Sequence, residues 1–153
     1  MYKDSIYAAI GLAAPVLEAH LDFDSFLAST LVPEVQIKHS GYNILRRRIA
    51  IVLGQWIVVK DINRNLVYSI FAHLLNKDDP MNDLVVRVTA GRQMKHVIDP
   101  LNIQVEHFIP HAHLVLSRLM DLISEVDLSE TRLALLDSLN SIVLRMEHHV
   151  GQN

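Results

Sequence analysis

Apolar side chains recur along this chain at steps of three and four residues, which is the spacing of one face of an α-helix. The clearest stripe lies within residues 43–58 and consists of Leu45, Ile49, Val52, Leu53 and Trp56. No stretch alternates apolar and polar residues as a half-buried strand would, so we predict no strand. The periodicity predicts an all-α protein with helices at about 3–17, 23–35, 43–58, 64–76, 82–98, 104–126 and 129–149.

Short polar residues stand where several of these helices should begin. Asp22, Asn82 and Ser129 are predicted N-caps, because such side chains accept hydrogen bonds from the free amides of a first turn. Asp83 and Glu130 place negative charge beside the positive end of the helix dipole. Local sequence therefore supports the helix starts that the apolar pattern indicates.

Small residues recur at a long period. Gly11 and Gly54 are 43 residues apart, Ala50 and Ala90 are 40 apart, and Ala90 and Ala134 are 44 apart. Periods near 40–47 residues, each holding two helices, are typical of HEAT repeats. We therefore predict a HEAT-repeat α-solenoid in which small residues let neighbouring second helices approach closely. The predicted segment covers 1–153 as a half repeat at about 3–17 and helix pairs at about 23–58, 64–98 and 104–149, and we expect it to be a piece of a longer solenoid.

Several residues are predicted to hold the repeats together. Arg47 and Arg87 lie 40 residues apart, so we expect Arg47 to connect neighbouring repeats and its two flanking arginines to face solvent. Its expected partners are the carboxylates of the turn before the next second helix, which are Asp78, Asp79 and Asp83. Trp56 continues an apolar stripe and is predicted to anchor the core.

Composition and charge exclude several classes of protein. The chain has 153 residues, 50% of them hydrophobic, which is too apolar for a disordered protein. It has no cysteine, which excludes a disulfide scaffold, a thiolate zinc site and a cysteine nucleophile. Three consecutive arginines at 46–48 could form a nucleic-acid or localisation patch, but they are few in a chain of net charge −3. The longest apolar runs, 7–17 and 49–59, are too short to span a membrane, so we expect a soluble protein.

Candidate chemistry is sparse. His107 and His111 have the i, i+4 spacing of zinc ligands, with His113 and Glu106 nearby, but Pro110 disturbs this spacing. The sequence has no HExxH motif, no glycine-rich phosphate loop, no paired-carboxylate motif and no strained serine elbow. We therefore expect a binding protein rather than an enzyme, with no metal and no cofactor.

One block of the sequence resembles a known family. Residues 42–56, YNILRRRIAIVLGQW, resemble a helix of the karyopherin-β nuclear transport receptors of the importin-11 type. Residues 3–17 resemble the fungal members in particular. The resemblance covers most of the chain, because it extends to 66–75, 83–90, 97–99, 108–110 and 130–134.

The resemblance implies a function and partners. Receptors of this kind are long HEAT superhelices that carry protein cargo through nuclear pores and release it when the small GTPase Ran enters in its GTP form. It implies that this chain is a central scaffold and cargo-binding segment of a nuclear import receptor that shuttles between nucleus and cytoplasm. The implied partners are cargo, nucleoporins and, through the full receptor rather than this segment alone, Ran-GTP; nucleic acid and membrane insertion are not implied.

The resemblance also suggests where partners bind. In this family the second helices line the concave face, where the polar positions off the apolar stripes are candidates for partner binding: Arg48, Gln55, Arg92, Lys95, Asp137, Ser141 and Arg145. The alternative function is a HEAT-repeat adaptor of another class, such as a phosphatase scaffold or a chromatin-complex subunit. An enzyme remains a third and more distant alternative.

Overall fold

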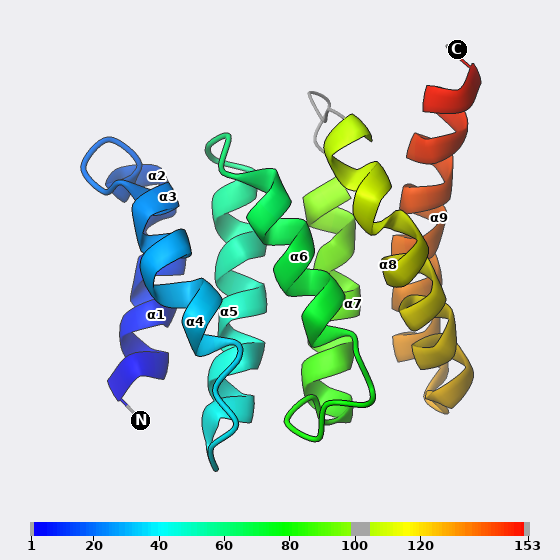
Figure 1. Ribbon diagram of the computed structural model, residues 1–153, viewed down its shortest axis with the longest axis horizontal. Coiled ribbons are helices and arrows are strands. Elements are labelled where there is room, and N and C mark those ends of the chain that lie inside the picture. Colours follow the sequence, from blue (N-terminus) through cyan, green and yellow to red (C-terminus); the bar gives the residue numbers. More distant parts are fainter. Residues whose placement is uncertain (1, 99–104, 152–153) are drawn as a thin grey trace.

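The chain forms a row of helices stacked side by side. The computed structural model describes residues 2–98 and 105–151, and this part of the chain contains helices and no strand. Figure 1 shows the row with the two termini at opposite ends, which is the predicted α-solenoid. The elements are α1 (Tyr2–Leu12), α2 (Ala14–Leu17), α3 (Phe23–Phe26), a π-helical turn (Leu27–Leu31), α4 (Val32–Glu34), α5 (Tyr42–Ile57), α6 (Arg64–Leu74), α7 (Leu84–Ile98), α8 (Val105–Glu125) and α9 (Ser129–Gly151).

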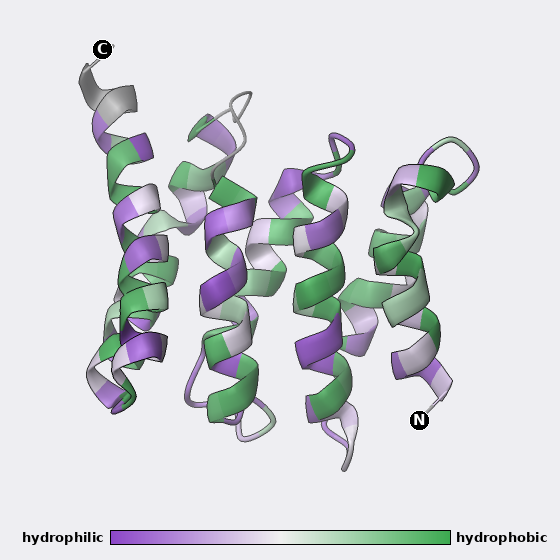
Figure 2. Ribbon diagram, turned by 180° about the vertical axis from the view of Figure 1, so that it is seen from behind, coloured by the Kyte–Doolittle hydropathy of each residue, from purple (hydrophilic) through white to green (hydrophobic). Residues whose placement is uncertain are grey.

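The helices form two layers. In one layer, α5 packs between α1 and α7, and α9 packs on the other side of α7. In the other layer, the short helices α3 and α4 are followed by α6 and α8, which pack against each other. We call the face formed by α1, α5, α7 and α9 the second-helix face, and this face is turned toward the viewer in Figure 2. No helix in the described ranges is long and apolar enough to cross a membrane.

Glycines mark the points where neighbouring second helices come closest. A Cβ atom added to Gly11 or Gly54 would collide with a glutamine side chain of the next helix, and one added to Gly91 would lie 2.6 Å from a leucine methyl. The facing residues are Gln55, Gln93 and Leu135, in that order. Of the alanines expected to permit close approach, Ala50 and Ala90 are fully buried and Ala134 is half-buried.

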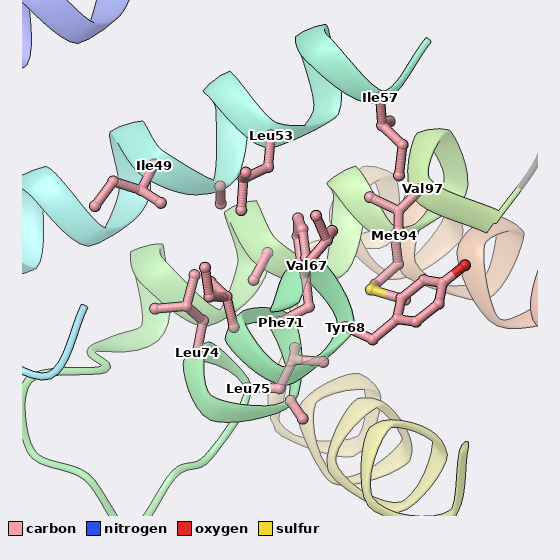
Figure 3. Close-up of a cluster of buried hydrophobic side chains, with 14 of the residues drawn as sticks. Ile49, Leu53, Ile57, Val67, Tyr68, Phe71, Leu74, Leu75, Met94 and Val97 are labelled. Carbon is pink, nitrogen blue, oxygen red and sulfur yellow. The ribbon is translucent and has the colours of Figure 1, made fainter. Parts of the chain in front are cut away.

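Apolar side chains from three consecutive helices fill the space between the layers. Figure 3 shows this cluster, to which α5, α6 with its C-cap Leu75, and α7 contribute Ile49, Leu53, Ile57, Val67, Tyr68, Phe71, Leu74, Leu75, Met94 and Val97. Trp56 of α5 lies where this helix meets α1 and α3, and it is fully buried. Its ring stacks on Phe23 with centroids 4.3 Å apart, and its Nε1 donates to the Ile10 carbonyl at 3.1 Å.

The first two predicted helices are more broken than the apolar pattern indicated. The helix expected over 3–17 divides near Ala13, because Pro15 lies in the first turn of α2. The helix expected over 23–35 contains a π-turn just before Pro33. Proline has no amide hydrogen to donate, so the wider turn accommodates the missing bond. The helix α8 runs through Pro110, and its predicted start at Gln104 lies outside the described residues.

The buried tryptophan gives a first prediction. We expect Trp56→Ala to lower the free energy of unfolding by about 3–5 kcal/mol, because it removes a large buried ring and leaves a cavity between two repeats. Denaturant unfolding followed by circular dichroism measures this loss. The matched control is Tyr2→Ala, whose side chain is 90% exposed and whose expected effect is within about 0.5 kcal/mol. Equal stability of Trp56→Ala and wild type would contradict the stacking role.

Candidate interaction surface

The arginine that joins neighbouring repeats is Arg46, so the prediction for Arg47 is wrong. The Arg46 side chain is completely buried, whereas Arg47 is exposed. Arg46 Nη1 donates to Asp79 Oδ2 at 3.0 Å and to Asn82 Oδ1 at 2.8 Å, and Nη2 donates to the Ile37 carbonyl at 3.2 Å. The guanidinium therefore ties the turn before its own helix to the turn before the next second helix.

The helical register explains the correction. Arg46 precedes Ile49, Ala50 and Leu53 by three, four and seven residues, and all three are fully buried. A side chain at those offsets lies on the buried face of α5, and Arg47 is turned away from it. These offsets can be read from the sequence. The prediction chose Arg47 instead because Arg47 lies one repeat period, 40 residues, before Arg87.

Arg87 makes a second connection of the same kind. Its Nη1 and Nη2 donate to the two carboxylate oxygens of Glu125 at 2.6 and 3.1 Å, and its Nε donates to the Asn82 carbonyl at 3.0 Å. A bidentate pair fixes the relative position of the two groups. Glu125 was not singled out from the sequence, because it lies 38 residues from Arg87 and outside any local motif.

The three predicted turn carboxylates have different roles. Asp79 is buried and is the partner of Arg46. Asp83 Oδ1 accepts from the Val86 amide at 2.9 Å, so Asp83 rather than Asn82 caps α7. The Asn82 amide instead donates to the carbonyls of His73 and Asn76, and it lies inside the turn. Asp78 is exposed and lies outside both arginine connections.

The buried connection shifts the pKa values of its neighbours. Burial alone would raise the pKa of Asp79, but the Met81 amide and the Arg46 guanidinium outweigh it and lower that pKa. Burial, reinforced by the charge of Arg46, lowers the pKa of His73. The His73 Nε2 atom lies 3.0 Å from the Val35 carbonyl oxygen and 3.6 Å from Asp79 Oδ2.

The candidate partner-binding residues all lie on helices of the second-helix face. On α5, Arg48 Nε donates to Asp4 Oδ1 of α1 at 2.9 Å. On α7, Lys95 Nζ donates to Asp137 Oδ2 of α9 at 2.6 Å. These side chains therefore join neighbouring helices of the layer as well as facing outward.

The other candidates differ in exposure. Gln55 covers Gly11 and is half-buried, and Ser141 and Arg145 of α9 are half-buried too. Arg92 is exposed on α7. The predicted residues thus lie on one face of the solenoid, although several of them also contact the neighbouring helix and stabilise the packing between repeats.

Two hollows on this face meet at Arg47, Thr89 and Arg92. The first continues across α7 to Ala134 and Asp137 of α9. The second has a largely apolar lining from the start of α7 and the loop before α9, formed by Leu84, Val85, Val88, Val126 and Leu128. Its loop side also carries Glu125 and Asp127. Such a surface can bind through charge-assisted hydrogen bonds and apolar contact.

The apolar part of this surface was not expected from the sequence. Val85 belongs to the apolar pattern of α7, but it is 55% exposed. The face of α7 that Val85 occupies is left uncovered by α5 and α9, which the helical period alone does not indicate.

The histidines near the start of α8 do not form a metal site in the part of the chain that the structure describes. No group of three histidine, aspartate or glutamate side chains there is placed to hold a metal ion. The ring of His111 instead lies 6.1 Å from that of Tyr68, and burial lowers its pKa.

The Arg46 connection gives a second prediction. We expect Arg46→Leu to lower the free energy of unfolding by about 3–5 kcal/mol, because it leaves the Asp79 carboxylate buried without its cation. Arg47→Leu, one residue away and exposed, is the matched control, with an expected effect within about 0.5 kcal/mol. Denaturant titration of both variants distinguishes them. An equal loss of unfolding free energy in both variants would contradict the assignment of the structural role to Arg46 alone.

His73 gives a prediction about pH. Its pKa in the folded protein lies below the ordinary value of 6.5, so the unfolded chain binds the proton first as pH falls. The contribution of neutral His73 to the free energy of unfolding is therefore present above pH 6.5 and is lost progressively below it. We expect His73→Gln to reduce this loss, measured as unfolding free energy against pH, with the exposed His20→Gln as matched control. An unchanged pH profile in His73→Gln would contradict the prediction.

Comparison with known proteins places nearly the whole chain beside nuclear transport receptors. It is 33% identical to Importin-11 of Mus musculus over 149 residues, and 31% identical to the importin beta-like protein KAP120 of Saccharomyces cerevisiae over 160 residues. These matches cover 95% and 99% of this chain. No family model matches the chain.

A solved structure agrees with these relatives. It is that of Lph2, described as a bidirectional nuclear transport receptor of S. cerevisiae, with a TM-score of 0.79 and 31% identity over 94% of this chain. The chain spans 15% of the length of this structure and of the two relatives. The chain is therefore homologous to one segment of the importin-β-like nuclear transport receptors of the importin-11 type.

Proposed function

We propose that this chain is a scaffold and cargo-binding segment of an importin-β-like nuclear import receptor. The observation that carries the proposal is the agreement of sequence and fold with a nuclear transport receptor over 94% of the chain. The segment binds and makes or breaks no covalent bond. Its partners in the receptor are protein cargo, nucleoporins and Ran-GTP, and the receptor shuttles between nucleus and cytoplasm.

The second-helix face supports the cargo-binding part of the proposal. The glycine contacts and the Arg46 and Arg87 connections fix α1, α5, α7 and α9 as one layer. A fixed layer loses little conformational freedom on binding, which favours affinity. The hollows around Arg47 and Arg92 provide a place on that layer for a partner.

A chimaeric receptor tests the function. The segment of KAP120 that matches this chain is replaced by residues 1–153, and the chimaera is expressed in yeast that lacks KAP120. We expect the chimaera to move between nucleus and cytoplasm and to restore transport of a KAP120-dependent cargo, followed by fluorescence. The Arg46→Leu chimaera is the folding-deficient control. A chimaera that binds Ran-GTP but restores no transport would contradict the proposal.

Ran binding by the segment alone gives a further prediction. Solenoid receptors distribute a partner's contacts along many repeats, and each lost hot spot removes about 2 kcal/mol or more. Since every 1.4 kcal/mol is about tenfold in affinity, a segment with few of these contacts should bind weakly. We expect calorimetry with Ran and a non-hydrolysable GTP analogue to detect no binding tighter than about 1 μM. A submicromolar dissociation constant would contradict the assignment to a central, cargo-binding part of the receptor.

A further inference from the structure

Two arginines on the second-helix face carry charges that the fold does not neutralise. Arg47 of α5 and Arg92 of α7 are both exposed, and neither has an ion pair or hydrogen bond with any side chain or backbone group that the structure describes. Other cations on the same face do have partners, since Arg48 pairs with Asp4 and Lys95 with Asp137. Arg47 and Arg92 line both hollows of this face, so they belong to one site.

The second hollow adds an exposed apolar lining to these charges. Leu84, Val85 and Leu128 are 43%, 55% and 73% exposed there. Exposed apolar side chains that share a hollow beside polar groups are characteristic of binding surfaces. The hollow therefore has a cationic part at the two arginines and an apolar part at the start of α7.

The acidic residues of the hollow lie on its loop side. Both Glu125 oxygens are held by the Arg87 guanidinium, so that carboxylate is neutralised by the fold. Asp127 is exposed in the loop before α9. The uncompensated positive charge therefore lies at Arg47 and Arg92, away from the loop.

We propose that this hollow binds a segment of a partner protein in which adjacent acidic residues are followed or preceded by apolar residues. The inference rests on the proposed function, because the partner is a cargo protein. The acidic pair lies against Arg47 and Arg92, whose guanidiniums can each hold a carboxylate through two hydrogen bonds. The apolar residues cover Leu84, Val85 and Leu128. A basic segment would meet repulsion at the two arginines, and a nucleic-acid backbone would leave the apolar lining uncovered.

A peptide titration tests the site. The probe is a short fluorescent peptide with a Glu-Glu pair beside a Leu-Leu pair in a Gly-Ser frame, made in both chain orders and titrated with the 153-residue chain by anisotropy. We expect at least one order to bind, and Arg47→Gln and Arg92→Gln each to weaken it by about threefold to tenfold, as for an exposed charge-assisted contact. The matched control is Lys60→Gln, an exposed cation outside both hollows, which should leave affinity unchanged.

Further variants separate the two parts of the site. Val85→Ser and Leu128→Ser should weaken binding, whereas Leu133→Ser, which is exposed but outside the hollow, should not. The double variant Arg47→Glu/Arg92→Glu should prefer a probe with Lys-Lys in place of Glu-Glu. Thermal melts establish that each variant is folded.

Several outcomes would overturn the inference. They are no binding of either peptide order, equal binding of a Gln-Gln probe, an equal loss in Lys60→Gln, or tighter binding of an oligonucleotide of equal charge. If any of these occurs while the KAP120 chimaera still restores transport, this site is rejected and the proposed function stands. If the chimaera fails but the peptide binds as expected, the site stands without that function.

Discussion

Each helix pair in this chain buries its apolar stripe against the next pair, and the rest of the structure depends on this stacking. A stripe left in water would forfeit roughly 25 cal/mol for each Å² of apolar surface. The fully buried Trp56 stacks on Phe23 of its own helix pair and donates to the Ile10 carbonyl of α1, so it is a large side chain at the place where α1 meets that pair. Where the helices of one layer must come closest, glycines at 11, 54 and 91 leave room for the neighbouring side chain.

Stacking also creates the need for the two arginine connections. The polar turns between helices are brought against the next repeat, where their carbonyls and carboxylates lose water. Arg46 and Arg87 supply donors at these places, and Asn82 is shared by both, through its side-chain oxygen and its backbone carbonyl. A buried charge of this kind adds less stability than its removal would cost, because breaking the pair strands the other charge. These connections therefore fix how one repeat is oriented on the next more than they add stability.

The proposed binding surface follows from the same geometry. A layer whose helices are fixed at each joint presents its outward side chains at set positions, which is what a binding surface requires. On the second-helix face some charged side chains form ion pairs with the neighbouring helix, whereas Arg47 and Arg92 form none among the described residues and lie beside an apolar hollow. The chain spans 15% of the length of the homologous receptors, so most of their surface lies outside it.

The sequence by itself determined the helical class, the repeat period, the buried tryptophan and the relationship to transport receptors. The helical class, the repeat period and the buried tryptophan depend on spacing within about 50 residues, where the helical period and residue type are sufficient. The relationship to transport receptors rests instead on the resemblance of blocks such as residues 42–56 to that family. Only the tertiary structure decided that Asp79 is the partner of Arg46, that Glu125 pairs with Arg87, and that Val85 is exposed. Adjacent positions on a helix lie about 100° apart, so which of them faces a neighbour depends on where that neighbour packs. That placement is set by side chains more than 30 residues away, such as the Asp79 that accepts from Arg46 across 33 positions, and no local pattern records it.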